Sequence, residues 1–459
     1  MNVRQQRIVL IGAGSAVFTQ GLIADMIQTP DTRWDVRLVD IDDEALESVA
    51  CLVERMIEAK GADIVVSSYT DRRDALPEAD IVVTTVAVGG RRAWEADVFI
   101  PRRWGIYQPV GDTAMPGGIS RALRMIPVML SIAKDIQTWC PQAWFFNYSN
   151  PMTAICRAIH RETSAVVTGL CHGVHHVESY LAKAAGVPLD QVTSLAIGLN
   201  HLTFVYDLRW KGLSLWPLLD VRLAREEGRP YDTSQVCPEL REFLNSQSPE
   251  TSLLNEPFAW SLYKNLGAYP AVNDRHVTEF YPEIFASGTY YGKTLGVDAF
   301  SFETTIRDGD QDYANMRAQA KGEKALREDL FQRAPGEHEQ LMEILDSISH
   351  DKRRTYSVNL PNSGSVPNVF PHGVLELPAA ACATGFRPLQ ASDFPDLLAA
   401  RINRHLATVE ITVEAALSGR MNLVVEALLS DGSCRDRSAA EGLAGELIEA
   451  HRDHLPQFA

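Results

Sequence analysis

The sequence predicts an α/β fold, with a doubly wound parallel sheet in the first part of the chain and a mixed α/β domain after it. Amphipathic patterns of helical period, notably at 42–60 and 119–137, lie between short apolar runs. Alternation of strands and helices favours a parallel sheet covered on both faces. The runs that we assign to strands are 7–11, 36–40, 63–67, 80–86, 144–147 and 165–170.

The first run leads directly into a glycine turn that is typical of nucleotide-binding folds. RIVLI at 7–11 is followed by GAGSAV at 12–17 and then by a helical pattern. Gly12 permits a tight turn, and Gly14 lets the backbone approach a pyrophosphate at the helix N-terminus. Val17 occupies the place of the usual third glycine, so the turn alone is a weak signal.

Asp40 strengthens this interpretation, because it ends the second strand run, VRLVD. A carboxylate at that point can accept the ribose hydroxyls and disfavours a 2′-phosphate, so we predict NAD rather than NADP. The sheet is therefore expected to be of the Rossmann type found in lactate and malate dehydrogenases. The cofactor-binding residues that we predict are Gly12, Gly14, Ser15, Ala16, Val17, Phe18, Asp40 and Asn150.

A chain of 459 residues is longer than one ordinary hydrophobic core accommodates. We predict an NAD-binding domain over 1–200 and a C-terminal domain over 201–459 that binds substrate and mediates oligomerisation. VNLPNSG at 358–364 and the helical patterns after residue 390 are expected to return to the active site.

Composition excludes several classes of function. The net charge is −16 and Lys and Arg form no cluster, which argues against nucleic-acid binding. No apolar run approaches the roughly 20 residues that span a bilayer. Seven cysteines, an odd number without framework spacing, fit reduced thiols. The apolar run near the N-terminus continues into the glycine turn, so we interpret it as a strand, not a signal peptide, and predict a cytoplasmic protein.

Four segments carry chemically active side chains near the expected strand ends. They are NYSNPM at 147–152, GLCHGV at 169–174, GLNH at 198–201 and AYPAVNDRHVTEFYP at 268–282. Taken singly, Cys171 is typical of a buried thiol, His201 of a hydrogen-bonded histidine and Asn150-Pro151 of a turn. Parallel sheets bind ligands at the carboxyl ends of their strands, so together these residues indicate a site.

Cys171 and His201 form a plausible pair of ligands for a divalent metal. Two protein ligands leave positions open for substrate oxygens, which suits catalysis better than a structural role. A Cys–His nucleophilic dyad is the alternative, although no signature of that class accompanies it and it leaves the nucleotide turn unexplained.

A series of motifs extends along nearly the whole chain: IVLIGAGSAVFT, VGG with IPRRWG, MPGG, NYSNPM, the Cys-His pair, GLNH, DRHVTEF, VNLPNSG, VLELP and SGRMNLVVEALLSD. In type and order these motifs resemble those of glycoside hydrolase family 4, the NAD- and metal-dependent glycosidases. The resemblance implies that the sugar is oxidised at carbon 3 by NAD, loses its aglycone by elimination, gains water and is reduced again. It also implies that Mn²⁺, held by Cys171 and His201, polarises the oxygen on carbon 3.

The resemblance also suggests the acid and the base. His172 follows the metal cysteine and is the candidate general acid, with binding of a sugar hydroxyl as the alternative. Asp274 is the candidate base and Tyr269 the second choice; the plain alternative for Asp274 is an ion pair with Arg275. Asn150 is expected to bind sugar hydroxyls beside the metal.

The sugar is predicted from the residues after Cys171. Cys-His-Gly-Val resembles the subgroup acting on α-galacturonides, whereas Cys-His-Ser is typical of α-galactosidases and Cys-His-Glu of α-glucosidases. A uronate needs an arginine, for which Arg275 is the first candidate, with Arg91 or Arg92 as alternatives and surface ion pairs as their plain interpretation. The family's Gln-Glu-Thr segment reads here as QPVGDT at 108–113, where Asp112 and Thr113 are left to contact substrate.

The prediction is therefore an α-galacturonidase that uses NAD and Mn²⁺ and forms a homodimer or homotetramer. An α-galactosidase, α-glucosidase or α-glucuronidase of the same family is the nearest alternative. An NAD-dependent hydroxyacid dehydrogenase is a second alternative, and a non-catalytic nucleotide sensor is a third. The metal pair argues against both of the latter, because neither requires a metal.

Overall fold

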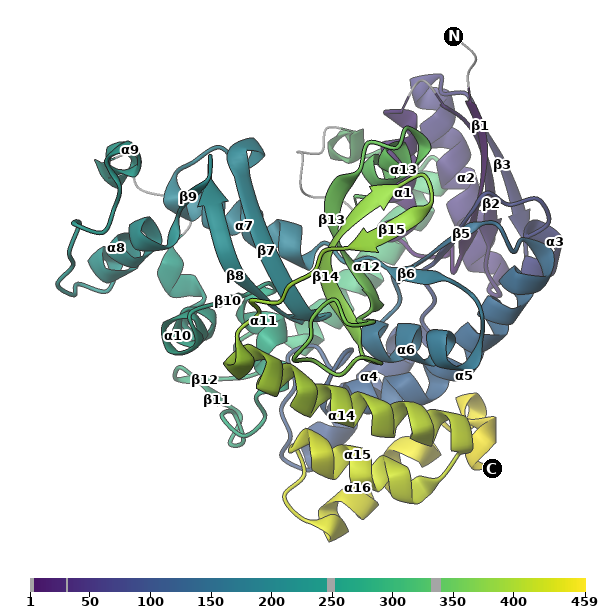
Figure 1. Cartoon of the computed structure of the whole chain (residues 1–459). Coiled ribbons are helices and arrows are strands. Elements are labelled where there is room, and N and C mark those ends of the chain that lie inside the picture. The colour runs from purple at the N-terminus through teal and green to yellow at the C-terminus, as the bar shows by residue number, and fades with distance from the viewer. Residues whose placement is uncertain (1–3, 30–31, 246–251, 332–339) are drawn as a thin grey trace.

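One sheet of 13 strands runs through the whole protein. The computed structural model describes residues 4–29, 32–245, 252–331 and 340–459. The strand order is β10-β8-β7-β14-β13-β6-β5-β4-β1-β2-β3, with β15 paired to β14 and β9 to β8. Figure 1 shows the N-terminal strands at one end of the molecule and β7, β8 and β10 at the other.

The first six strands are parallel and follow the order 3-2-1-4-5-6 of a doubly wound nucleotide-binding fold. All six coincide with the runs predicted from the sequence, within a few residues at their ends. Their bounds are β1 Arg4–Ile11, β2 Thr32–Val39, β3 Ile64–Tyr69, β4 Ile81–Thr84, β5 Trp144–Asn147 and β6 Val167–Gly169.

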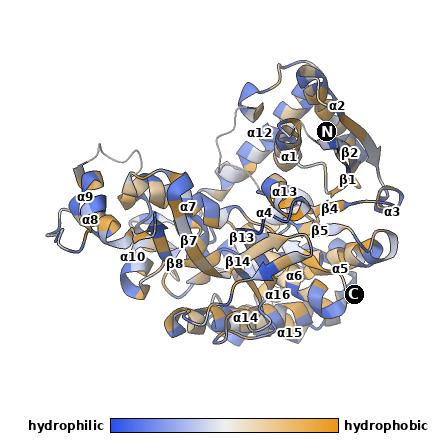
Figure 2. Ribbon diagram, turned by 45° about the horizontal axis from the view of Figure 1, so that its top comes forward, coloured by the Kyte–Doolittle hydropathy of each residue, from blue (hydrophilic) through white to orange (hydrophobic). Residues whose placement is uncertain are grey.

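Helices cover both faces of this parallel sheet, as its side chains require. In β1, Ile8 and Leu10 join one apolar core while Val9 and Ile11 join another, because successive strand residues point to opposite faces. Figure 2 shows apolar residues concentrated along the central strands β4 and β5. The helices are α1 Phe18–Ile27, α2 Asp43–Lys60, α3 Arg72–Ala75, α4 Gly90–Arg103, α5 Met115–Trp139 and α6 Met152–Glu162.

An antiparallel half continues the same sheet beyond β6. Asn359 in β13 pairs with Gly169 in β6, and Glu376 in β14 pairs with Gly198 in β7. The late segment around residue 360 therefore lies beside the strand that precedes Cys171, as predicted. The strands are β7 Val192–Leu199, β8 Leu202–Trp210, β9 Leu213–Ser214, β10 Tyr269–Pro270, β13 Arg354–Pro361, β14 Val374–Cys382 and β15 Gly385–Pro388, with the separate hairpin β11 Thr289–Tyr290 and β12 Lys293–Thr294.

The remaining helices support the two ends of the sheet. Helix α12 packs on α2, and α14 packs on α5, so segments from the second half cover the first (Figure 1). Within the described residues, no helix is both long enough and apolar enough to cross a membrane. The helices are α7 Gly173–Ala185, α8 Trp216–Glu226, α9 Pro238–Arg241, α10 Pro257–Leu266, α11 Asn273–Val277, α12 Phe302–Ala320, α13 Leu341–Ser349, α14 Asp396–Ser418, α15 Met421–Asp431 and α16 Arg437–Ala450.

The division into domains at residue 200 stays a prediction. That residue lies in the tight turn between β7 and β8, and the sheet is continuous on both sides of it.

Candidate active site

The glycine turn has the conformation that its sequence predicts. Gly12 has a φ of 86°, and a Cβ there would lie 2.9 Å from the carbonyl oxygen of Thr85. The N–H of Gly14 donates to Oδ2 of Asp40 at 2.7 Å, and a Cβ on Gly14 would lie 2.7 Å from the same oxygen. Side chains at either position would therefore push the turn away from β2 or β4.

The helix after the turn begins with its own cap. The hydroxyl of Ser15 accepts the N–H of Phe18 at 3.2 Å, which satisfies one donor at the start of α1. Val17, in the place of the third glycine, is 60% exposed and lines the cavity in front of the turn. The ring of Phe18 packs against Tyr148 with centroids 4.7 Å apart.

We expect Gly14→Val to abolish NAD binding without unfolding the protein. The branched side chain would meet the Asp40 carboxylate and Ala45, so the turn would have to move into the space in front of it. Isothermal titration with NAD measures the effect, and circular dichroism checks the fold. Gly445→Ala in α16 is the control, because Gly445 has no left-handed backbone conformation and a Cβ there meets no atom within 4 Å. Tight NAD binding by Gly14→Val would contradict the assignment of the turn.

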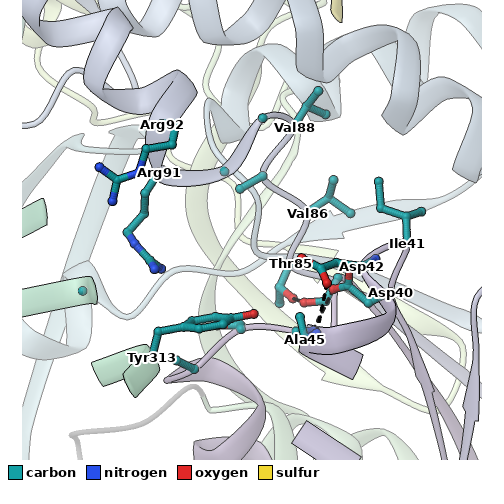
Figure 3. Close-up of a pocket in the computed structure, with 18 of the residues that line it drawn as sticks. Asp40, Ile41, Asp42, Ala45, Thr85, Val86, Val88, Arg91, Arg92 and Tyr313 are labelled. Carbon is teal, nitrogen blue, oxygen red and sulfur yellow. Dashed lines mark hydrogen bonds between the residues drawn. The ribbon is translucent and has the colours of Figure 1, made fainter. Parts of the chain in front are cut away.

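A cavity of about 1640 Å³ opens in front of this turn. Figure 3 shows Asp40 and Asp42 on one wall, with Tyr313 of α12 and the side chains of Arg91 and Arg92 on the other. Arg91 lies 5.0 Å above the Tyr313 ring and pairs with Asp310, as Arg92 does. The predicted uronate candidates Arg91 and Arg92 therefore line the nucleotide cavity. The cavity extends from Gly12 and Gly14 as far as Asp112 and Arg121.

At that far end, Asp112, His201 and His276 bring one potential ligand atom each to within 4.8 Å of one another. His201 lies in the two-residue turn between β7 and β8 with a φ of 75°, a strained conformation that a side chain rarely adopts. Its Nδ1 lies 2.8 Å from the hydroxyl of Thr113, which fixes the ring. The ring of His276, on α11, lies 4.2 Å from that of His201 between centroids.

The electrostatics of this cluster suit a cation. Burial would raise the pKa of Asp112, but His201 and His276 in their protonated forms, together with Arg121, lower it to about 2. Burial lowers the pKa of His201 and, with the nearby charge of His201, lowers that of His276 to about 3. Near neutral pH the cluster therefore consists of one carboxylate and two neutral imidazoles, which is a ligand set for a divalent metal.

Asn150 joins the cluster through its amide. Its Nδ2 donates to Oδ2 of Asp112 at 3.1 Å, and its backbone oxygen accepts Nε of Arg121 at 3.0 Å. Its Oδ1 is buried without a hydrogen-bond partner among the described residues. That free acceptor suits a hydroxyl of a bound sugar or cofactor, and the role of Asn150 stays a prediction.

Cys171 and His172 stand at the start of α7. The thiol of Cys171 is half-buried and accepts the N–H of Gly173 at 3.4 Å. His172 is exposed, and when protonated it lowers the pKa values of His201, His276 and Glu376. The trio that the structure brings together shares His201 with the predicted pair but has Asp112 and His276 as its other members.

Asp274, in α11, is buried against the N-terminus of α10. Its two carboxylate oxygens accept the N–H groups of Phe258 at 2.8 Å and Ala259 at 2.6 Å, and the hydroxyl of Tyr290 at 2.5 Å. Burial raises its pKa above the ordinary value. Asp274 therefore caps α10 and its hydrogen bonds go to these groups, whereas Arg275 donates to Thr305 at 2.9 Å.

Tyr269, the other predicted base, lies fully buried in β10. Its hydroxyl donates to Oδ1 of Asn273 at 3.1 Å, and its ring stacks on Tyr180 with centroids 5.9 Å apart. Burial raises the pKa of Tyr269 well above its usual range.

Glu256, next to Asp274, makes the stability of this region pH-dependent. Its carboxylate accepts the N–H of Asp274 at 2.8 Å, and burial raises its pKa from 4.5 to about 7. The folded state holds this proton more tightly than the unfolded state, so stability falls as pH rises from 4.5 to 7 and the cost is full above that range. The free energy of unfolding lost through ionisation of Glu256 is about 3 kcal/mol at most.

We therefore expect Glu256→Gln to raise the melting temperature at pH 8 and to leave it unchanged at pH 4. The amide keeps an oxygen for the N–H of Asp274 but cannot ionise. Differential scanning calorimetry across that pH range measures the effect, and Glu239→Gln on α9 is the exposed control. An equal gain at both pH values would contradict the raised pKa.

One hydrogen-bond donor of Arg275 is unpaired. Its Nε is buried and has no hydrogen-bond partner among the described residues, while its charge lowers the pKa of His276. It lies near the cluster, whereas Arg91 and Arg92 are held by Asp310 in the nucleotide cavity.

Several residues of this region have contacts that the sequence does not predict. Glu279 accepts the N–H of Val110 at 3.1 Å and that of Gly111, so it holds the loop that carries Asp112. Glu376 of the VLELP motif accepts the hydroxyl of Thr203 at 2.5 Å, and burial raises its pKa to about 7. The stretch DRHVTEF, with His276 between two acids, was the available signal for both His276 and Glu279.

Comparisons with known proteins agree with this architecture. Residues 7–187 match the model of the family 4 glycosyl hydrolases, and residues 196–433 match the model of the C-terminal domain of the same family. An α-galactosidase of Bacillus subtilis (strain 168) is 28% identical over 99% of this chain and 100% of its own. An α-galacturonidase of the same organism is 27% identical over 97% of each chain.

A solved structure has the same fold. It is a 6-phospho-α-glucosidase from gut microorganisms in complex with NAD and glucose-6-phosphate, with a TM-score of 0.82 and 21% identity over 99% of this chain and 100% of its own. The two family models together span most of the chain, which confirms the family predicted from the motifs and favours a glycosidase over a dehydrogenase. The chain belongs to the family 4 glycosyl hydrolases.

Proposed function

We propose that this protein is an NAD- and divalent-metal-dependent α-glycosidase whose substrates are α-galacturonides. The observation that carries the proposal is the position of the Asp112–His201–His276 cluster. Its carboxylate belongs both to the cluster and to the lining of the nucleotide cavity, so a metal and a dinucleotide would meet there.

The described residues fit both groups. One carboxylate and two imidazoles form a donor set for Mn²⁺ or a similar ion, to which we add the thiol of Cys171, two residues before α7. Nδ1 of His276 is buried without a hydrogen-bond partner among the described residues, so its lone pair or proton is available. Gly12, Gly14 and Asp40 form the pyrophosphate and ribose ends of an NAD site.

When bound, NAD supplies a hydride acceptor and donor, and the metal supplies a Lewis acid for the sugar oxygen. The side chains of this chain have the other roles. Asn150 would hold a sugar hydroxyl against Asp112, and His172 would give a proton to the departing glycosidic oxygen. Asp274, or Tyr269 in its place, would take the proton from carbon 2.

Hydrolysis of aryl α-glycosides tests the proposed function directly. We expect release of the aglycone from an aryl α-galacturonide only when NAD and Mn²⁺ are both added, and complete loss of activity with a chelator. Neutral α-galactosides and α-glucosides serve as the comparison. Full hydrolysis without either addition would contradict the redox route, and faster hydrolysis of a neutral glycoside would contradict the uronide.

Arg275 is proposed to bind the carboxylate of the uronide. We expect Arg275→Lys to reduce kcat/KM for the galacturonide by roughly 10- to 100-fold, because a bidentate guanidinium contact is replaced by a point charge. The loss on an aryl α-galactoside should be much smaller. Steady-state kinetics on the two substrates measures the ratio, and Arg307→Lys, with its exposed partner Asp308, is the control. Equal losses on both sugars would refute this role.

Location in the cytoplasm and assembly into a homodimer or homotetramer belong to the same proposal. The reduced cysteines of the sequence support the first, and the resemblance to the family supports the second. Light scattering of the purified protein tests the assembly.

A further inference from the structure

A small buried chamber of about 40 Å³ lies next to the Asp112–His201–His276 cluster, since Thr113 and Asn200 line it. The β7–β8 turn, the start of α5 and the helices α6, α14 and α15 enclose it. Five polar residues on its wall matter here: Thr113, Thr153, Asn200, His405 and Asp431. The chamber does not touch the nucleotide cavity's glycine turn and plays no part in the roles assigned above.

Four of these side chains present polar atoms that have no hydrogen-bond partner among the described residues. They are both amide atoms of Asn200, the hydroxyl of Thr153, Nε2 of His405 and Oδ2 of Asp431. Asn200 is 1% exposed, and Thr153 and His405 are 5% exposed each, so bulk water does not reach them. Buried polar groups of this kind are normally satisfied, since leaving them unpaired is costly.

Water is the ligand whose chemistry fits this wall. Asn200 offers a donor as well as an acceptor, and a cation would leave the donor unpaired; five polar atoms in so small a space disfavour an apolar guest. The ring of His405 packs edge to face against that of Phe280, with centroids 5.3 Å apart, and its Nε2 is an unpaired group on the chamber wall. At 10–15 Å³ for each water, the volume accommodates about three molecules.

The chamber is connected to the metal ligands on two sides. Asn200 immediately precedes His201 in the strained turn, and Thr113 lines the chamber while its hydroxyl bonds Nδ1 of His201. Asp431, the last residue of the SGRMNLVVEALLSD motif, accepts the N–H of Met115 at 3.1 Å and so ties α15 to the start of α5. This gives the C-terminal motif a role close to the site.

We propose that the chamber holds a cluster of ordered waters that fixes the Asn200–His201 turn and thereby positions His201 for the metal. The effect on the metal rests on the proposed function, whereas the water cluster itself does not.

A crystal structure of the protein with NAD and Mn²⁺ tests the water directly. We expect ordered density within hydrogen-bonding distance of the Asn200 amide, the Thr153 hydroxyl and Nε2 of His405. A chamber without ordered density, or direct pairing of these atoms with other protein groups, would overturn the proposal even where the metal site is occupied.

The positioning role is tested by the affinity for Mn²⁺, followed by electron paramagnetic resonance. We expect His405→Phe, which fills the chamber with an apolar ring, to weaken binding by about tenfold. Thr153→Val, of nearly equal volume, removes one partner of the water and should weaken binding in the same direction; it also serves where His405→Phe fails to fold. His160→Phe on α6 is the matched control, because that histidine bonds the backbone of Val167 outside the chamber.

The outcomes separate the two proposals. Unchanged Mn²⁺ affinity in both chamber variants would refute the positioning role. Failure of the parent protein to bind Mn²⁺ would refute the proposed metal site and the positioning role together, while the crystal structure would still decide on the water cluster.

Discussion

Replacing His276 with alanine is expected to lower the affinity for Mn²⁺ and the rate of aglycone release by about 100-fold or more, while NAD binding persists. The imidazole is one of three groups that the fold brings to within 4.8 Å, and its loss leaves the Asp112 carboxylate with one histidine partner. Changes one step further from a metal already cost 10- to 100-fold in affinity or activity, so removal of a ligand costs at least as much. Titration with Mn²⁺, followed by kinetics at saturating metal, measures the two effects separately.

A second variant tests whether Cys171 binds the same metal as the Asp112–His201–His276 cluster. Cys171→Ser should also lose metal-dependent activity while the protein folds and binds NAD, because we predict that the thiolate faces the same ion. His350→Ala on α13, an exposed histidine whose side chain is 66% accessible, is the control. Full activity in Cys171→Ser together with loss in His276→Ala would restrict the metal to Asp112, His201 and His276. Full activity in His276→Ala would contradict the cluster.

The order of elements in the first half follows closely from the sequence, because the strands are short apolar runs and some of the helices have local caps. α2, for example, begins at Asp42, whose side chain accepts the N–H of Ala45, and ends at Gly61 in a left-handed conformation. Such local signals can be read without knowledge of the tertiary structure.

Long-range pairing explains most of what the sequence left open. β13 and β14 insert between β6 and β7 through the single pairs Asn359–Gly169 and Glu376–Gly198, although nearly 200 residues separate the partners. No local pattern specifies that register. The same holds for Asp112 and His276, which 164 positions separate; the loop 108–113 that carries Asp112 is held by Glu279. The sequence indicates the segments that contain these residues, but only the folded structure shows which side chains lie close together.

Asp274 illustrates the opposite case, in which a residue found by sequence has two possible duties. The structure shows it as the cap of α10, receiving two N–H groups and the Tyr290 hydroxyl. A cap and a base would both suffer from Asp274→Asn, because the amide can neither accept all three bonds nor remove a proton. Activity alone therefore cannot separate the two duties.

The relative basicity of the two candidates predicts which residue removes the proton. Burial raises the pKa of Asp274 from its low ordinary value, which brings it closer to neutrality, whereas burial raises that of Tyr269 further above 10. A base is most effective when its pKa lies near the working pH, and such groups contribute about 10²- to 10⁴-fold. We therefore expect Asp274→Asn to lose exchange of the carbon 2 proton with solvent deuterium by that factor, whereas Tyr269→Phe keeps it within about tenfold.

The stability of the same variants decides whether the loss is chemical. Removing a charged cap from buried N–H groups costs about 1–3 kcal/mol of the free energy of unfolding, so Asp274→Asn must be assayed well below its melting temperature. Asp436→Asn, which alters the cap of α16 away from the site, shows what loss of a cap alone does to exchange. If Asp274→Asn loses stability but exchanges normally while Tyr269→Phe does not exchange, Asp274 is a helix cap and Tyr269 is the base. The carboxylate would then act through Tyr290 and the start of α10, holding the stretch that carries Arg275 and His276 in place without touching the sugar.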